Sequence, residues 1–369
     1  MNCRICTRCG RCGKPTESPI VDSGTPSVAV KPVQRPGLGL AADIGTTTIA
    51  ARVYDLSTGR LVRRASLYNP QRSVAADVMG RISAALDGRL DELRLSVRSA
   101  LRSCLGGLVP AEAVVVGNTT MLHLLAGESP GSYAVAPFRA KRLFGERVAL
   151  DGIDALLPRC AHAFWGADAV AAALASGMCG RPGPELFADV GTNGELAVSR
   201  GGRLTVASVA AGPAFERPGI RGSDLVTALA DALDAGTVDA TGLVTGTPDA
   251  GLVQSDVRAV QLAKAALSAG LSVLMERTGT HADDVTRLTL AGGLGTALDP
   301  AKAARIGLIP SALAPRTRLC GNLALEGASM MLLDPSLADA ADRLARESEH
   351  VELGGNPEFS KLFMASMGF

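Results

Sequence analysis

Residues 41–62 read A-A-D-I-G-T-T-T-I-A-A-R-V-Y-D-L-S-T-G-R-L-V, and residues 188–205 read A-D-V-G-T-N-G-E-L-A-V-S-R-G-G-R-L-T. Three positions of the first stretch align with three of the second at a constant offset of 146: Asp43 with Asp189, Gly45 with Gly191, and Thr46 with Thr192. A shared Gly-Arg-Leu then aligns at an offset of 143, so only the hairpin loop is shorter. Each copy predicts an apolar strand ending in aspartate, a glycine turn and a returning strand.

Phosphate binding is the chemistry that this repeated turn favours. Glycine lets the turn tighten until successive backbone N–H groups converge on an anion. Hydroxyl and amide side chains add further donors in both copies: Thr46, Thr47, Thr48, Thr192 and Asn193. The carboxylates of Asp43 and Asp189 can hold Mg²⁺ through water, since this ion keeps much of its hydration shell. Two ordinary hairpins are the alternative, and the close register of the two copies favours phosphate.

Composition limits the class of protein. The chain has 369 residues, 47% of them hydrophobic, which is enough for two domains with their own cores. A net charge of +1 and an aromatic content of 3% argue against a nucleic-acid partner. We find no apolar run long enough to cross a membrane and no hydrophobic signal core, so we expect a cytoplasmic protein without a membrane partner.

Four of the eight cysteines are crowded at the start of the chain: Cys3, Cys6, Cys9 and Cys12. In a reducing compartment such a cluster indicates metal binding rather than disulfides. The first three follow the C-x₂-C-x₂-C spacing of ferredoxins, which favours an iron–sulfur cluster, expected as [4Fe–4S]. The fourth departs from the ferredoxin pattern, so zinc and an unliganded tail remain alternatives.

The chain is expected to divide into four parts. Residues 1–13 form the Cys-rich segment, and residues 14–37 form a Pro-rich, solvated linker that buries almost nothing. Deletion of residues 1–36 should therefore cost little stability. Residues 38–184 and 185–369 form two α/β domains that repeat one plan.

Other segments extend this plan. A buried strand at 113–116 leads into a polar turn with Asn118, which we expect to face the ligand, while His123 on the following helix is expected to pack in the core. Residues 127–160 carry basic side chains and are interpreted as a solvated loop surface. Helices are predicted near 223–233 and 255–278. A strand near 288–291 runs into Gly292 and Gly293, where backbone can approach a base or ribose closely.

The motifs Asp43–Thr48, Asp189–Gly194 and Ala291–Gly293 resemble the phosphate 1, phosphate 2 and adenosine motifs of the acetate and sugar kinase, Hsp70 and actin superfamily. Longer stretches are similar to the ATP-dependent reductive activators of corrinoid proteins: N-P-Q (69–71), A-D-V-M-G-R-I (76–82), V-G-N-T-T-M-L-H-L-L (116–125), D-V-G-T-N-G-E (189–195), A-G-P-A-F-E (211–216), Q-L-A-K-A-A-L-S-A-G-L (261–271), A-G-G-L-G (291–295) and N-P-E-F (356–359). These matches cover nearly all of the chain beyond the linker.

The resemblance implies two actin-like, ribonuclease H-like domains with a nucleotide cleft between them. It implies an ATPase that returns the cobalt of a methyltransferase corrinoid protein from Co(II) to Co(I), with an iron–sulfur cluster as electron carrier. Asp43 and Asp189 would orient Mg²⁺, Gly194 would belong to the second phosphate loop, and Glu195 or Glu216 would position the attacking water. The short cysteine run replaces the usual ferredoxin-type domain of the relatives.

Two alternatives remain open. One is a small-molecule kinase on the same scaffold. The other is an ATPase that binds the corrinoid protein while an external ferredoxin-type donor supplies electrons. The apolar C-terminal segment offers a surface for a homodimer or a partner, although docking on its own core is the commoner use: Phe359, Leu362, Phe363, Met367 and Phe369.

Overall fold

The computed structural model describes residues 24–215, 220–248 and 251–369. The chain forms two compact units. One holds the chain up to Ser176 together with Asn322–Arg346, and the other holds Gly177–Gly321 with Glu347–Phe369. The first boundary thus falls at 176/177, where 184/185 was predicted, and a late segment of the chain returns to the first unit.

The first unit is built on a mixed six-stranded sheet with the order β3-β2-β1-β4-β6-β5. Strands β1, β2 and β3 are antiparallel neighbours, whereas β1, β4 and β6 run parallel. Its strands and helices are β1 (Leu38–Ile44), β2 (Thr48–Asp55), β3 (Arg60–Tyr68), α1 (Val78–Ala84), α2 (Leu90–Leu105), β4 (Glu112–Gly117), α3 (Thr119–Ala126), β5 (Glu146–Leu150), β6 (Ile153–Leu157), α4 (Ala167–Ser176), α8 (Leu323–Leu333) and α9 (Ser336–Glu347, whose last residue belongs to the second unit).

The second unit has a six-stranded sheet in the order β11-β10-β7-β8-β9-β12. Its strands and helices are β7 (Glu185–Val190), β8 (Asn193–Arg200), β9 (Arg203–Ala210), α5 (Gly222–Asp234), α6 (Gln254–Thr278), β10 (Arg287–Gly292), α7 (Pro300–Arg305), β11 (Thr317–Gly321), β12 (Glu349–His350) and α10 (Pro357–Ala365). The order β9-β8-β7-β10-β11 repeats the order β3-β2-β1-β4-β6 of the first unit. The predicted α/β class with a repeated plan is confirmed.

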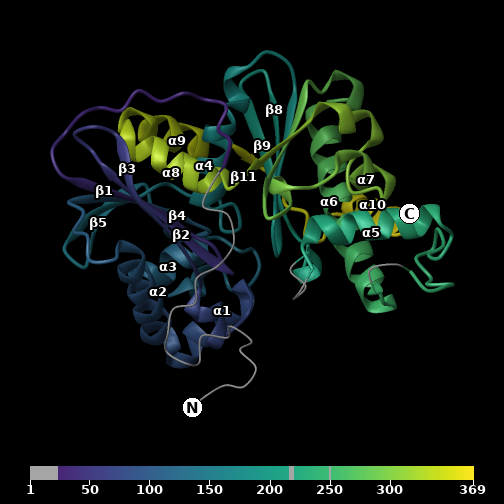
Figure 1. Cartoon of the computed structure of the whole chain (residues 1–369), viewed down its shortest axis with the longest axis horizontal. Helices are drawn as coiled ribbons and strands as arrows, with labels where there is room; N and C mark the ends of the chain where they lie inside the picture. Colours follow the sequence, from purple (N-terminus) through teal and green to yellow (C-terminus); the bar gives the residue numbers. More distant parts are fainter. Residues whose placement is uncertain (1–23, 216–219, 249–250) are drawn as a thin grey trace. The chain divides into compact units, whose positions relative to one another are not determined.

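Helix α8 belongs to the first unit because its apolar surface packs there. It contacts α4, β1 and β4, and Figure 1 shows α8 and α9, in yellow, beside the purple and blue strands. The backbones of α8 and α4 approach closely, since a Cβ on Gly327 would lie 2.2 Å from the carbonyl oxygen of Ala171. Each fully buried leucine of α8, such as Leu325, contributes roughly 2 kcal/mol to folding.

Helix α6 corrects the expectation that no apolar segment is long enough to cross a membrane. Among the described residues it is the one helix long and apolar enough to cross a membrane by length and composition. However, 72% of its apolar window is buried in the protein, where it packs on β8, β9 and α10. This burial is typical of a core helix. The C-terminal segment docks on the same core, with Phe359, Leu362, Phe363 and Phe369 packed against it.

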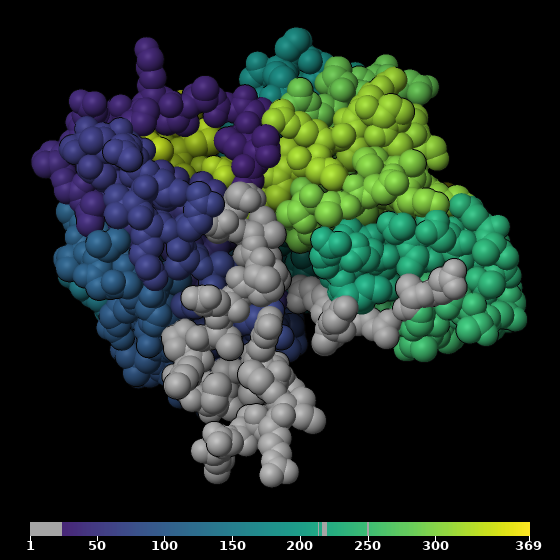
Figure 2. Space-filling view, in the orientation of Figure 1, coloured from purple at the N-terminus to yellow at the C-terminus, as the bar shows by residue number. Residues whose placement is uncertain are grey.

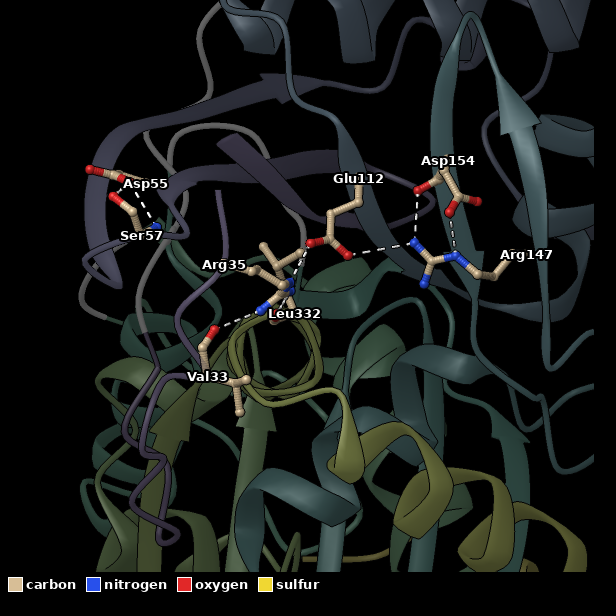
Figure 3. Close-up of polar contacts among 8 residues, drawn as sticks. All are labelled: Val33, Arg35, Asp55, Ser57, Glu112, Arg147, Asp154 and Leu332. Carbon is tan, nitrogen blue, oxygen red and sulfur yellow. Dashed lines mark hydrogen bonds and ion pairs between the residues drawn. The ribbon is translucent and has the colours of Figure 1, made fainter. Parts of the chain in front are cut away.

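Residues 24–37, which we call the strap, contain no helix or long strand, but they are bound to the first unit rather than solvated throughout. The amide of Val33 donates to the carbonyl of Leu333. Arg35 pairs with Glu112 and donates to the carbonyl of Leu332, while Glu112 also faces Arg147 (Figure 3). Figure 2 shows purple atoms of this end of the chain against the yellow atoms of the late helices.

Residues 127–160 are more ordered than predicted. They contain strands β5 and β6, which pair antiparallel at the edge of the sheet. Arg147 lies on β5 and pairs with Asp154 of β6 at 2.7 Å, and Arg142 pairs with Glu128 and Glu146. The basic side chains therefore tie this region together through cross-strand and local ion pairs.

Candidate functional site

The carboxylate of Asp43 stands at the end of β1 in the first unit. Its Oδ2 accepts a hydrogen bond of 2.9 Å from Nδ2 of Asn322. The same asparagine caps α8, since its Oδ1 accepts from the amide of Leu325. Burial raises the pKa of Asp43 to about 6, and the bond from Asn322 opposes that rise. The end of α8 therefore fixes the orientation of this carboxylate.

Hydrogen bonds donated to its three carbonyl groups hold the turn at 45–47 that follows β1. Asn69 Nδ2 donates to the carbonyl of Gly45 at 2.8 Å, and the Asn69 amide donates to that of Thr47 at 2.9 Å. Between them, the Arg81 guanidinium donates to the carbonyl of Thr46 at 2.6 Å. Carbonyl and N–H point in opposite directions in a trans peptide. The N–H groups of Thr46 and Thr47 therefore point away from Asn69 and Arg81, as anion binding requires.

Two further groups lie at the same edge of the first sheet. Asn118 caps α3, and its Nδ2 donates to the Thr46 hydroxyl at 3.2 Å. Gly166 packs directly on it, because a Cβ there would lie 2.4 Å from Asn118 Cα and 2.6 Å from Oδ1 of Asp168. Asp168, in the first turn of α4, therefore places a second carboxylate beside Asn118. His123 is buried as expected, with Nδ1 hydrogen-bonded to the carbonyl of Thr119.

The second unit presents its own turn between β7 and β8. The Gly191 amide donates to the carbonyl of Asn193, and the Gly212 amide donates to that of Thr192. Gly292, at the end of β10, has a φ of +74°. A Cβ there would lie 2.2 Å from Oδ1 of Asp189. Only glycine fits this position, because both the backbone angle and the neighbouring carboxylate exclude a side chain.

Other predicted residues of the second unit fall at different places. Glu195 is directly opposite Asp189 in the β7–β8 ladder, so both carboxylates lie on one face of the sheet. Gly194 lies against α6, where a Cβ would be 2.5 Å from Leu267 Cδ2; this packing by itself accounts for the glycine. Gly293 is exposed, and no atom lies within 4 Å of its missing Cβ.

Several predicted ligands lie outside the described residues: Cys3, Cys6, Cys9, Cys12 and Glu216. Within residues 24–215, 220–248 and 251–369, no three His, Cys, Asp or Glu side chains gather as a metal site. A lone carboxylate such as Asp43, with one oxygen bound by Asn322, fits Mg²⁺ that takes its other ligands from water and phosphate.

The sequence did not identify four residues that the structure places at the first turn or beside Asn118: Asn69, Arg81, Asp168 and Asn322. The first two lie in the motifs N-P-Q and A-D-V-M-G-R-I, which were noted without a role. Asn322 follows a short strand and precedes an apolar helix, so its capping role was readable. Its contact with Asp43 was not, since 279 positions separate the two residues.

Comparisons with known proteins agree with these features. The family model for the "RACo middle region" matches residues 38–181. The model for the "C-terminal domain of RACo the ASKHA domain" matches residues 183–221 and 244–369. The first match contains the turn after Asp43, and the second contains Asp189 and Gly292.

Two curated proteins are similar in sequence. "Corrinoid activation enzyme RamQ" from Eubacterium limosum is 29% identical over 91% of this chain and 71% of its own length. "[Co(II) methylated amine-specific corrinoid protein] reductase" from Methanosarcina barkeri is 23% identical over 63% of this chain and 54% of its own. The chain thus spans little more than half of the second relative.

A solved structure, "Reductive activator for corrinoid,iron-sulfur protein", superposes with a TM-score of 0.82 at 24% sequence identity. The match covers 91% of this chain and 67% of the other. At this identity the likeness establishes a shared fold.

Proposed function

Because the chain belongs to the RACo family of reductive activators of corrinoid proteins, we propose that it uses ATP to return a corrinoid protein from Co(II) to Co(I). The observation that carries the ATP site is the first turn, whose three carbonyls are bound from one side by Asn69 and Arg81. The names of the two curated relatives support the corrinoid substrate.

Each residue of the first turn has a defined part in this proposal. The N–H groups of Thr46 and Thr47 and the Thr46 hydroxyl bind phosphate oxygens. Asp43, oriented by Asn322, holds Mg²⁺ through water, and the ion supplies charge neutralisation at the phosphates. In the second unit Asp189 and Thr192 take the corresponding parts, and the glycine at 292 keeps space beside Asp189.

Three carboxylates are candidates for positioning the attacking water. Glu195 shares a sheet face with Asp189, and Asp168 lies beside Asn118 in the first unit. Glu216 remains a sequence-based candidate. A group in this part must reach the water by a hydrogen bond, so substitution by the isosteric amide separates the three: the true one loses turnover while ATP affinity is retained.

The electron carrier is assigned to the cysteine segment. We propose that Cys3, Cys6, Cys9 and Cys12 hold an iron–sulfur cluster, of the [4Fe–4S] type, that receives electrons from a ferredoxin-type donor in the cytoplasm. Iron and acid-labile sulfide analysis of anaerobically purified protein tests this. Zinc without sulfide would instead assign a structural metal.

The decisive experiment follows cobalt by its absorption spectrum. Full-length protein, ATP, Mg²⁺ and a strong reductant are mixed with a Co(II) corrinoid protein, and we expect conversion to Co(I). Replacement of all four cysteines by serine should stop reduction and leave ATP binding intact. Reduction that persists in this variant would indicate an external donor. Phosphorylation of a small acid or sugar with no change at cobalt would refute the proposal in favour of a kinase.

A further inference from the structure

Arg81 on α1 is the most completely buried arginine in the described part of the chain, with 0% of its surface exposed. Its guanidinium has four partners. Nε donates to the carbonyl of Ala75 at 3.1 Å, Nη1 lies 3.1 Å from both Gln71 Oε1 and Met121 Sδ, and Nη2 donates to the carbonyl of Thr46 at 2.6 Å. All four partners are neutral, and three of the four are oxygen atoms of buried or half-buried residues: Gln71 of the N-P-Q segment, Ala75 before α1 and Thr46 of the turn.

The charge of Arg81 is therefore uncompensated. The other deeply buried arginine of the first unit, Arg52, lies 2.8 Å from the carboxylate of Glu326. Arg81 has no such ion pair among the described residues. The charges that act on its pKa are those of Arg72, which lowers it, and of Asp77, which raises it. Asp77 is exposed and caps α1. Burial lowers the pKa of Arg81 to about 10, which still leaves it charged at neutral pH.

Burial of a charge without a partner is costly. A buried cation directly behind an anion-binding turn can be compensated by the anion that binds there. This anion would lie on the other side of the Thr46–Thr47 peptide, because the carbonyl of Thr46 faces Arg81 and the N–H of Thr47 faces away. A cation on the carbonyl also polarises this peptide and strengthens its N–H as a donor.

We propose that the guanidinium of Arg81 is the fixed counter-charge of the bound phosphate groups, acting through the Thr46–Thr47 peptide without touching the ligand. Arg81 is in this sense a positioning residue, and the inference rests on the proposed ATP site. It explains why the turn needs a charged residue behind it, where a neutral amide such as that of Asn69 suffices for the adjacent carbonyl.

The test is a calorimetric titration of the full chain with AMP, ADP and ATP, in EDTA so that no Mg²⁺ contributes. A unit charge about 7 Å away, at an effective dielectric constant of about 20, changes affinity by on the order of tenfold to fiftyfold. We expect Arg81→Met to raise the Kd of ATP by about this factor, that of ADP by less and that of AMP least. Arg81→Lys, which keeps the charge, should restore most of the loss.

Gln71→Glu provides a variant without a cavity. It places a carboxylate next to Nη1 of Arg81, where Oε1 of the glutamine now lies at 3.1 Å, and so neutralises the charge in place. We expect the same graded loss of affinity, most for ATP. Arg98→Met is the matched control, since Arg98 also donates Nε to a backbone carbonyl of the first unit, that of Leu125; its affinities should match the wild type.

The outcomes are distinct. Equal losses for the three nucleotides, or an Arg81→Lys variant as weak as Arg81→Met, would show that Arg81 only shapes the turn. Wild-type affinity in Gln71→Glu would also overturn the inference, and this variant decides the matter if Arg81→Met does not fold. If the wild-type protein binds none of the three nucleotides, the proposed ATP site itself fails.

Discussion

The two hairpin turns begin from nearly the same sequence and are supported in different ways. After Asp43, three residues separate β1 from β2, and buried polar side chains from outside the hairpin bind their carbonyls. After Asp189, two residues separate β7 from β8, and the turn is held by backbone bonds involving Gly191 and Gly212. Side chains from outside the hairpin fix the peptides of the longer turn, whereas hydrogen bonds between backbone groups hold the shorter one.

A repeated motif therefore specifies the local shape of the turn and does not specify the residues that surround it. The first aspartate is oriented by an amide, Asn322. The second has a glycine, Gly292, pressed against its carboxylate. In the first unit, the Arg81 guanidinium and the Asn69 side chain bind the carbonyls of the turn. In the second unit, the absence of a side chain at Gly292 leaves room for the Asp189 carboxylate. Four comparisons between paired variants test this contrast.

The largest effect is expected at the two aspartates. Asp43→Ala and Asp189→Ala should each lower Mg²⁺-dependent ATP turnover by on the order of 100-fold or more, because each removes a carboxylate that we propose holds the ion. Asp55→Ala is the control, since this carboxylate lies at the other end of β2 and accepts hydrogen bonds from Ser57 and Thr58 of the turn that follows it. Loss of turnover in one aspartate variant alone would show that the two copies are not functionally equivalent.

Gly45 and Gly191 occupy equivalent positions in the two turns, and we expect their substitution to affect stability differently. A Cβ at Gly45 would lie 2.9 Å from the carbonyl oxygen of Thr48, whereas one at Gly191 would have its nearest neighbour at 3.6 Å. We expect Gly45→Ala to lower the free energy of unfolding by about 1–3 kcal/mol and Gly191→Ala to change it by less than about 0.5 kcal/mol. Thermal and denaturant unfolding measure both, and equal effects would contradict the contrast.

Asn322 tests the support of the first aspartate. Asn322→Ala removes both the helix cap and the bond to Asp43, and should cost about 1 kcal/mol of stability. Asn322→Asp keeps a capping oxygen for the Leu325 amide and places a second carboxylate beside Asp43. This repulsion raises the pKa of Asp43 further. By linkage, a raised carboxylate pKa lowers the free energy of unfolding at neutral pH. We therefore expect Asn322→Asp to be less stable than the wild type at pH 7, to regain stability as the pH falls, and to need more Mg²⁺ for ATP turnover in a metal titration; an unchanged requirement would separate Asp43 from the ion.

The strap is tested by its contribution to stability. Gly24 lies against Asn322, where a Cβ would be 2.7 Å from its carbonyl oxygen, and its amide donates to Glu326 at 2.8 Å. Deletion of residues 1–36 should therefore lower the free energy of unfolding by about 1–2 kcal/mol, contrary to the expectation for a solvated linker. Deletion of residues 1–23 is the control and should cost less. Equal melting temperatures would show that the strap contacts are energetically neutral.

Local sequence was sufficient for the elements of the repeat. The helix predicted near 223–233 is found at Gly222–Asp234, and the long helix predicted near 255–278 is found at Gln254–Thr278. The prediction of the corrinoid-activator family is confirmed by the two family models. Strands β5 and β6 were missed, because each has only five residues and too few alternating apolar and polar positions to show the period of a strand.

By itself, then, the sequence determined the paired Asp-Gly-Thr turns, the α/β class and the family, since each depends on residues close together along the chain. Only the tertiary structure decided that α8 returns to the first unit, that Asn322 reaches Asp43 across 279 positions, and that Arg81 lies buried behind the turn. An arginine in an amphipathic stretch is usually exposed. Its burial depends on whether distant segments close over it, because the free energy of a buried charge is set by all of its neighbours in space.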